Sequence, residues 1–248
     1  MYAILDNITE LFTLQSLFVI DLNTNTLINQ TILENNGNYT YQYLEISYNP
    51  VNHVLNCLAI DLSTNLTFVG HLTMDGEIVA YDTLNWTAIG AGVSYGLMNA
   101  AYYPPGNIFI VALPNMNTTG YYTQTLRLYD VSKGLLINTV QTNDYYSNFD
   151  YTSYYGCMIA SDGGEFVLLD ITSGVSKPLP INNMPNIDTS MATQAVGENT
   201  LYYSMQGDND NVYLCTIEFT AGPLVASCLS SHTNYAGLLH GQMIVSPF

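Results

Sequence analysis

A serine between two glycines is the first candidate for chemistry in this chain. Gly92-Val93-Ser94-Tyr95-Gly96 matches the G-x-S-x-G pattern, in which a sharp strand-to-helix turn exposes a nucleophilic serine. An acid and a histidine follow later in the chain, in the order that such a catalytic triad requires. The segment after Ser94 soon reaches Pro104, however, and no long helix is predicted around it. We therefore interpret the segment as a Gly-rich loop between strands.

A second candidate is a group of carboxylates in the middle of the chain, namely Asp144, Asp150, Asp162 and Glu165. Paired carboxylates perform glycoside hydrolysis, one as the acid and the other as base or nucleophile. The spacing selects no pair among the four. The sequence therefore assigns no catalytic residue, and we expect a protein that is not an enzyme, with a glycosidase or an esterase-type hydrolase as the weaker alternative.

Metal-ligand patterns are incomplete. Gly207-Asp208-Asn209-Asp210-Asn211 carries oxygen ligands at alternate positions, as the first part of a calcium loop does. The EF-hand spacing fails, because Gly is missing at the sixth position and Glu at the twelfth. The four histidines lack metal-ligand spacing and no Cys-x-x-Cys occurs. We expect a polar loop, no metal site and no cofactor, with calcium at this loop as the alternative.

Two of the four cysteines flank the last predicted hairpin. A turn at Ala221-Gly222 places Cys215 opposite Cys228, and opposed strand residues lie close enough for a disulfide. We predict this bridge, which is typical of an oxidising compartment. Cys57 and Cys157 fall in different parts of the fold, and the sequence does not pair them.

Six Asn-x-Thr sequons suggest N-glycosylation, and all of them precede residue 120. The alternative is that these residues serve polar turns. If the sites carry glycans, the protein is extracellular and residues 120–248 form the bare contact surface. The chain start lacks a basic n-region and an apolar h-region, so we expect any secretory signal to have been removed or to lie outside this sequence. The sequon asparagines are Asn7, Asn29, Asn38, Asn65, Asn85 and Asn117.

A tyrosine-rich segment follows, in residues 143–155. Tyrosine rings stack on sugars and are favoured at protein interfaces, but they also pack between sheets. Both interpretations stay open for this segment. Its candidate contact residues are Tyr145, Tyr146, Tyr151, Tyr154 and Tyr155.

We expect β-strands to position the candidate carboxylates, cysteines and tyrosines, because one strand-and-turn pattern recurs along the chain. An apolar run ends in an acidic residue, a tight polar turn follows, and a second apolar run begins at once. The acidic side chain caps the turn as an Asx turn, and Gly or Asn supplies a positive φ. The acidic positions lie on average about 50 residues apart, close to the ~40–50 residues of a four-stranded propeller blade. They are Asp21, Asp82, Asp130, Asp170 and Glu218, while Asp61 is interpreted as an extra hairpin in a long second blade.

The pattern resembles that of the WD40/YVTN-like β-propellers. Residues 97–140 and 191–229 each follow the strand, turn, strand outline of a blade in those families, although the Gly-His and Trp-Asp signatures of WD40 blades are absent. The resemblance implies an all-β chain that forms a single β-propeller over residues 1–248. We predict five blades, with six as the alternative.

The two ends of the chain are expected to close this ring. Residues 1–33 are too short for a complete blade, and the apolar run within 235–248 supplies the missing inner strand. Sharing a blade between the two termini removes an exposed sheet edge. The alternative is that a terminal strand completes a neighbouring copy and builds a polymer. Residues 178–190, with three prolines, are predicted to be a long linker between blades.

Composition excludes several classes of partner. Charged residues make up 9% of the 248, Lys and Arg total 3, and the net charge is −17. Such a chain has almost no side chains for phosphate contacts, so we expect no nucleic acid partner. No run is apolar and long enough for a membrane span.

These observations favour an extracellular, secreted or cell-surface structural or adhesive propeller. One form of it is the repeating subunit of a filament or surface coat. The alternative is a carbohydrate-binding propeller that uses the tyrosine-rich segment. Expected partners are copies of itself, other extracellular glycoproteins or glycans.

Overall fold

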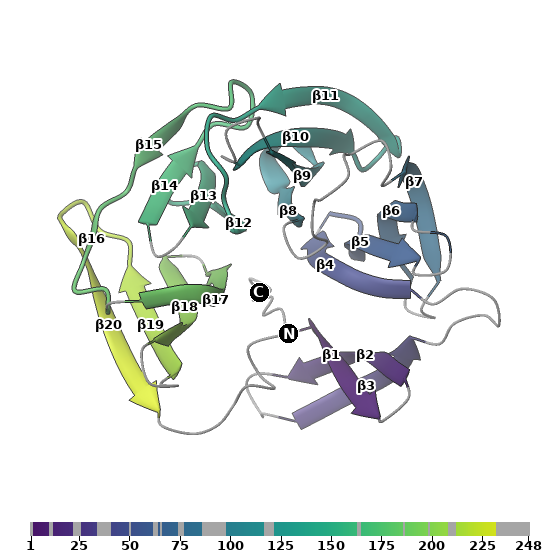
Figure 1. The fold of residues 1–248 in the computed structure, drawn as a ribbon, viewed down its shortest axis with the longest axis horizontal. Coiled ribbons are helices and arrows are strands. Elements are labelled where there is room, and N and C mark those ends of the chain that lie inside the picture. The colour runs from purple at the N-terminus through teal and green to yellow at the C-terminus, as the bar shows by residue number, and fades with distance from the viewer. Residues whose placement is uncertain are drawn as a thin grey trace.

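The described residues form five mainly antiparallel sheets arranged in a ring, which is the architecture of a β-propeller (Figure 1). The computed structural model describes residues 2–9, 12–21, 26–33, 41–49, 51–61, 64, 66–73, 77–85, 98–116, 122–162, 165–185, 187–197, 199–207 and 212–231. The predicted all-β propeller fold is confirmed, and the sheets correspond to the five predicted blades.

Each blade is a meander in which consecutive strands pair from the centre of the ring outward. Blade 1 contains β1 (Tyr2–Thr9), β2 (Phe12–Asp21) and β3 (Thr26–Leu33). Blade 2 contains β4 (Tyr41–Asn49), β5 (Val54–Asp61), β6 (Leu66–Leu72) and β7 (Ile78–Asn85). Blade 3 contains β8 (Asn99–Tyr103), β9 (Ile108–Met116), β10 (Tyr122–Asp130) and β11 (Leu135–Gln141), with a short 3-10 turn at Pro104–Gly106. Blade 4 contains β12 (Asn148–Thr152), β13 (Cys157–Asp162), β14 (Glu165–Leu169) and β15 (Ser176–Pro178). Blade 5 contains β17 (Ile187–Val196), β18 (Thr200–Gly207), β19 (Val212–Glu218), β20 (Leu224–Ser231) and the added strand β16 (Ile181–Asn182).

The acidic turns at the ends of β10 and β14 have the predicted chemistry. The Asp130 carboxylate accepts hydrogen bonds from the Ser132 and Lys133 backbone amides at 3.0 and 3.2 Å. Bonds from Lys133 and Ser132 lower the pKa of Asp130 to about 2. The Asp170 carboxylate binds the Thr172 amide in the same way. Glycine completes both turns with a positive φ, which is +60° at Gly134 and +73° at Gly174. Residues that carry a Cβ rarely adopt these backbone angles.

Two acidic positions were assigned wrongly from the sequence. Asp82 lies inside the outer strand β7, and the connection from β6 to β7 instead runs through residues 73–77. Its carboxylate contacts a neighbouring blade, which is why an acidic residue follows an apolar run there without a turn. Asp61 ends β5 and begins the ordinary hairpin to β6, so blade 2 has four described strands and no extra hairpin.

Three outer strands share a bulge at an equivalent place. In β3, β7 and β11 the pairing with the preceding strand shifts by one residue, which leaves Ile28, Tyr81 and Ile137 without a direct partner. A bulge bends a strand and increases its twist. The shared position shows that these three blades are repeats of one structural unit, although their sequences differ.

The apolar core is divided among the boundaries between blades. One cluster joins blades 2 and 3 and includes Leu58, Val69, Phe109 and Tyr129. A second joins blades 3 and 4, a third joins blades 4 and 5, and a fourth covers the other face of blade 2. Alternate side chains of each strand point to opposite faces, so one sheet contributes to two clusters.

The predicted linker 178–190 also contains strand structure. Within it β16 pairs in parallel with β20, the outer strand of blade 5, through Ile181–Leu224 and Asn182–Val225. The prediction of a simple linker was therefore wrong, because this segment covers an outer strand edge that would otherwise be open. The closing strand predicted within 235–248 lies outside the described residues. None of the helices in the described ranges is long and apolar enough to cross a membrane.

Candidate ligand-binding cavity between blades 3 and 4

A cavity of about 480 Å³ brings together acidic and aromatic side chains from both blades. This volume lies within the range of small-molecule sites, about 300–1,000 Å³. The cavity is formed by the start of β10, the connection from β11 to β12, and the β13–β14 hairpin. Its lining residues are Tyr122, Asp144, Tyr145, Tyr146, Asp162, Glu165 and Val167.

A buried glutamine fixes the connection that carries three of these residues. The side chain of Gln124 in β10 is completely buried. Its Nε2 donates to the Tyr146 carbonyl at 2.7 Å, and its Oε1 accepts from the Tyr146 amide at 3.0 Å. Thr142 closes the same network, since its amide donates to the Gln124 carbonyl at 2.9 Å. A buried amide that is satisfied on both sides holds the backbone in one place, so the cavity wall is preorganised.

Two carboxylates face each other at the β13–β14 hairpin. Asp162 and Glu165 are directly opposed in the strand register. Burial raises the pKa of Asp162, and the negative charge of Glu165 raises it further. Opposed like charges are unfavourable, and hydrogen-bond donors from a ligand would relieve that repulsion.

Tyrosine rings form the other walls of the cavity. Tyr146 is buried, burial raises its pKa, and its hydroxyl lies 3.4 Å from Asp144 Oδ2. The rings of Tyr122 and Tyr145 lie with centroids 6.1 Å apart and tilted by 58°. Tyr122 is 38% exposed. The cavity thus has one aromatic ring that is open to solvent, Tyr122, and one that is buried, Tyr146.

The structure separates the predicted site residues into two groups. Three of the four carboxylates line the cavity, and Asp150 does not. Tyr145 and Tyr146 line it as well, whereas Tyr151 packs against Tyr103 and the pair Tyr154 and Tyr155 packs against Phe219. Sequence reasoning missed Tyr122, Gln124 and Val167, because no spacing signal connects them with the carboxylates.

Asp150 lies on the inner strand β12 and pairs with Ile159 of β13. Burial raises its pKa to about 8, and a hydrogen bond with Gln194 opposes part of that rise. Gln194, which lies on the next blade, also accepts from the Ser161 hydroxyl at 2.8 Å and donates to the Ile159 carbonyl at 3.1 Å. Asp150 therefore belongs to a polar contact between blades 4 and 5.

The predicted disulfide between Cys215 and Cys228 is present, and it joins opposed positions of β19 and β20. Cys57 and Cys157 are both free. Burial raises the pKa of the Cys57 thiol to about 12, so this side chain behaves as part of the apolar core.

Several predicted sites lie outside the described residues. These are the Ser94 segment, positions 208–211 of the calcium-like loop, and the sequon residues Asn38, Asn65 and Asn117. Asn7 lies on β1, Asn29 on β3, and Asn85 ends β7. Across the described ranges, no group of three or more His, Cys, Asp or Glu side chains is arranged to hold a metal ion.

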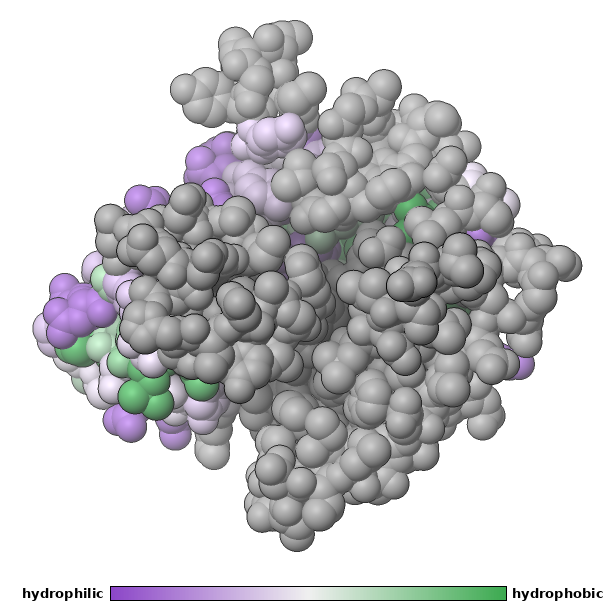
Figure 2. All heavy atoms as spheres, turned by 60° about the horizontal axis from the view of Figure 1, so that its bottom comes forward, coloured by the Kyte–Doolittle hydropathy of each residue, from purple (hydrophilic) through white to green (hydrophobic). Residues whose placement is uncertain are grey.

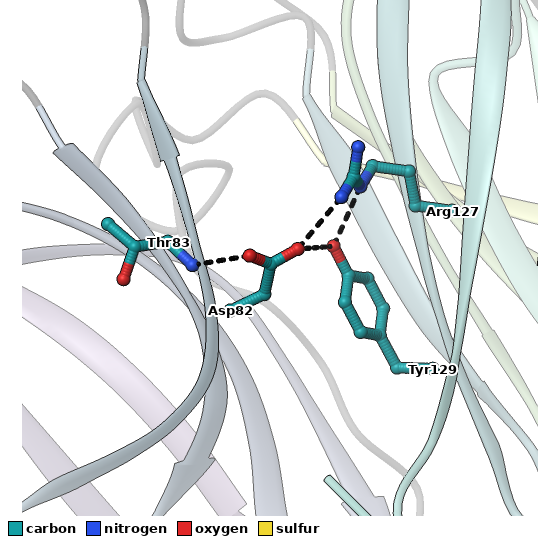
Figure 3. Close-up of polar contacts among 4 residues, drawn as sticks. All are labelled: Asp82, Thr83, Arg127 and Tyr129. Carbon is teal, nitrogen blue, oxygen red and sulfur yellow. Dashed lines mark hydrogen bonds and ion pairs between the residues drawn. The ribbon is translucent and has the colours of Figure 1, made fainter. Parts of the chain in front are cut away.

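The arginine of the chain forms a contact between blades (Figure 3). Arg127 Nη2 donates to Asp82 Oδ2 at 2.8 Å, and Arg127 Nε donates to the Tyr129 hydroxyl at 2.8 Å. The Tyr129 hydroxyl in turn donates to Asp82 Oδ2 at 2.8 Å. Arg127 and Tyr129 lie on β10 of blade 3 and Asp82 on β7 of blade 2, so this cation is used to join the blades.

Comparison with known proteins finds matches among solved structures. No family model matches the sequence, and no curated protein matches it either. Similar solved structures include the WD40 repeats of RRP9 (11% identity, 82% of this chain and 56% of that chain, TM-score 0.46). They also include the WD40 domain of SCAP from fission yeast (8%, 88% and 60%, TM-score 0.43). A third is the WD40 domain of coronin from Toxoplasma gondii (11%, 87% and 54%, TM-score 0.43).

The chain spans less than two thirds of the length of each of these three proteins. At such low identity the likeness concerns the fold alone. The ring of sheets itself makes the chain a β-propeller.

Proposed function

We propose that this protein is an extracellular, N-glycosylated adhesive propeller that binds carbohydrate in the cavity between blades 3 and 4. The observation that carries the proposal is the lining of this cavity, which combines three tyrosines with three carboxylates and one valine. Carboxylates accept hydrogen bonds from hydroxyl groups, and aromatic faces cover the apolar faces of a ring.

The negative charge of the cavity lining indicates which sugars could bind there. The cavity lining contains no cationic side chain, and the whole chain has 3 Lys and Arg residues with a net charge of −17. An anionic sugar or a phosphate would meet repulsion there without a compensating cation. Neutral sugars fit this environment, because their hydroxyls donate to Asp144, Asp162 and Glu165.

The distribution of sequons supports an adhesive role. All six precede residue 120, whereas every residue that lines the cavity follows it. Glycans on the first half of the chain would leave the cavity side bare and accessible. The disulfide between Cys215 and Cys228 agrees with an oxidising, extracellular compartment.

Binding to an array of neutral, amino and acidic glycans tests the proposal, followed by calorimetry on the best ligand. Tyr122→Ala removes the exposed ring of the cavity and should weaken binding ~2- to 12-fold, since a stacked ring contributes about 0.5–1.5 kcal/mol. Tyr154→Ala is the matched control, because Tyr154 is 40% exposed and packs outside the cavity. Absence of any glycan binding, or an equal loss in both variants, would overturn the proposal. Hydrolysis of the bound glycan would replace it with a glycosidase.

Intact mass before and after enzymatic glycan removal tests the extracellular part of the proposal. We expect added mass that disappears on treatment and maps to peptides from residues 1–120. A purified native protein without any glycan mass would contradict it.

A second candidate function is that of a repeating subunit in a filament or coat. It is favoured by apolar side chains that remain exposed on β19 and β20 of blade 5 (Figure 2), among them Leu214 at 44%, Val225 at 50% and Leu229 at 76%. Negative-stain imaging of the native protein tests it, since a subunit of this kind should be recovered as long regular particles.

A further inference from the structure

The chain has very few cationic side chains for its length. It contains 3 Lys and Arg, 4 His and 20 Asp and Glu among 248 residues. Charged residues make up about 25% of an ordinary domain, with both signs represented. The 20 carboxylates are no more than an ordinary share, so the net charge of −17 comes from missing cations and not from an excess of acidic residues.

This balance changes the effect of acid on the fold. In an ordinary protein the carboxylates become neutral at low pH, the cations remain, and their mutual repulsion favours unfolding. Here 3 Lys and Arg and 4 His supply at most 7 positive side-chain charges, whereas about 30 would remain in an ordinary chain of this length. The strongest repulsion instead occurs at neutral pH, and it falls as the carboxylates become protonated below about pH 5.

The described contacts between blades consist mainly of neutral groups, which acid does not titrate. Blades 4 and 5 are joined by Gln194, which accepts from the Ser161 hydroxyl at 2.8 Å and donates to the Ile159 carbonyl at 3.1 Å. Blades 2 and 3 are joined by Asn49 Nδ2, which donates to Asn107 Oδ1 at 3.1 Å. Two further neutral contacts between blades join the Tyr102 amide to the Ser47 hydroxyl and Asn99 to the Ser147 carbonyl.

One ion pair between described residues is the exception to this pattern. Asp82 and Arg127 lie 2.8 Å apart across blades 2 and 3, and protonation of Asp82 would weaken their contact. The ion pair of Lys133 with Asp130 lies within a single turn. Bonds from Lys133 and Ser132 lower the pKa of Asp130 to about 2, so its contribution to stability is lost only as the pH falls below the unfolded value near ~3.9 towards 2. In the described ranges, acid therefore has one charged contact between blades to break.

The Asp150 carboxyl acts in the opposite direction and favours the acidic range. It lies on β12, and Gln194 of β17 forms a hydrogen bond with it from blade 5. Burial raises the pKa of Asp150 to about 8, and no charged side chain in the described ranges contributes to that shift. Because this value lies above the unfolded value near ~3.9, the protonated form stabilises the fold at low pH, and this contribution is lost as the pH rises through about 8.

We propose that this protein works in an acidic medium, and that its fold is more stable near pH 4 than at neutral pH. The inference goes beyond the proposed glycan binding and does not depend on it. Protonated carboxyl groups keep an acceptor oxygen, so the cavity between blades 3 and 4 could still bind hydroxyl groups under these conditions. A saline medium also suits a high negative charge, because salt screens the repulsion, but the ordinary number of carboxylates favours acid.

Urea unfolding of the intact protein between about pH 3 and pH 8, at constant ionic strength, tests the proposal. We expect a higher urea midpoint at pH 4 than at pH 7. The near-UV circular dichroism, which a molten globule loses, should persist at pH 3. A midpoint that falls from pH 7 to pH 4, or loss of the near-UV signal by pH 4, would overturn the proposal. A midpoint that rises with salt at pH 7 but falls towards acid would also overturn it and would assign the charge balance to a saline medium.

Added cations test whether the charge balance is the cause. Val51, Val79 and Val175 are 62%, 46% and 55% exposed, so a triple Lys variant adds three surface charges, and the triple Gln variant is its matched uncharged control. Relative to the Gln variant, the Lys variant should have a lower urea midpoint at pH 3 and a higher one at pH 7, because the cations increase repulsion in acid and reduce it at neutral pH. The same pH dependence in both variants would refute this cause. If the Lys variant fails to fold, the pH profile of the wild type still decides.

Discussion

Removing Asp82 should measure how strongly one polar contact holds two blades together. Its carboxylate accepts hydrogen bonds from Arg127 Nη2, from the Tyr129 hydroxyl and from the Thr83 amide, each at 2.8 Å. Tyr129 is completely buried, and burial raises its pKa, so its hydroxyl remains a donor at physiological pH. In Asp82→Ala, Arg127 keeps its bond to Tyr129 but loses its counter-charge.

The stability lost in Asp82→Ala depends on how far solvent reaches the contact between Asp82 and Arg127. A hydrogen bond to a charged group contributes about 1.5–3 kcal/mol, whereas an ion pair at the surface contributes about 0–1 kcal/mol. The Arg127 and Asp82 side chains are 25% and 29% exposed, so solvent screens part of the interaction. We therefore expect Asp82→Ala to lower the free energy of unfolding by about 2 kcal/mol, which corresponds to a fall in Tm of ~4–8 °C for a chain of this size.

Thermal and urea unfolding of the variant series provide the assay. Glu218→Ala is the control, because Glu218 is exposed and its removal changes the net charge by the same amount. Arg127→Met and the double variant with Asp82→Ala complete a double-mutant cycle, in which we expect a coupling energy of about 1 kcal/mol. If Asp82→Ala costs no more stability than Glu218→Ala, or if the effects of Asp82→Ala and Arg127→Met simply add, the contact does not hold blades 2 and 3 together.

Two further predictions concern pH and the disulfide. Asp150 has a folded pKa of about 8, above its unfolded value near ~3.9, so its protonated form stabilises the fold at low pH and this contribution is lost as the pH rises through about 8. The Asp150→Asn variant keeps a neutral side chain at every pH, so its free energy of unfolding relative to that of the wild type should increase between pH 5 and pH 9. Because Asp150 retains some exposure, we expect an increase of only ~1–2 kcal/mol, measured by urea unfolding. A difference between the two proteins that does not change with pH would contradict this prediction. Replacing both Cys215 and Cys228 by serine opens a loop with a sequence separation of 13 and should cost about 3 kcal/mol, with a Tm equal to that of the wild type under reducing conditions. An unchanged Tm under oxidising conditions would show that the bridge contributes nothing.

The strands were predictable because their signal is local. Apolar runs separated by turn residues indicated the strands within 97–140 and 191–229, although β17 begins at Ile187, before the second of these ranges. The same local rule failed at Asp82, whose carboxylate is used by Arg127 of the next blade. A turn residue and a residue that joins two blades have the same type and the same apolar neighbours, so sequence alone does not separate them.

The cavity was only half predictable for a related reason. Asp144, Asp162 and Glu165 were candidates, but nothing in their spacing distinguished them from Asp150. The distinction arises when Gln124 fixes the connection from β11 to β12 beside the β13–β14 hairpin. Tyr122 lies 22 residues before Asp144 and enters the cavity only because β10 begins at that rim of its blade. Contacts of this kind depend on the packing of blades, which no short pattern encodes.

The division of the apolar core among the blade boundaries bears on how such a chain can grow or shrink in evolution. Among the described residues, blades 3 and 4 each contribute side chains to the clusters on both of their faces, so neither of these blades has a complete core of its own. Evolution must therefore keep the two facing apolar surfaces of neighbouring blades compatible. An inserted blade is tolerated when each of its two faces packs against the face of its new neighbour. A truncation after β11, by contrast, would expose Leu126, Leu128 and Val140 of the second cluster to water. Such a fragment should associate with other chains to cover them, which makes the loss of whole blades far more hazardous than change within one.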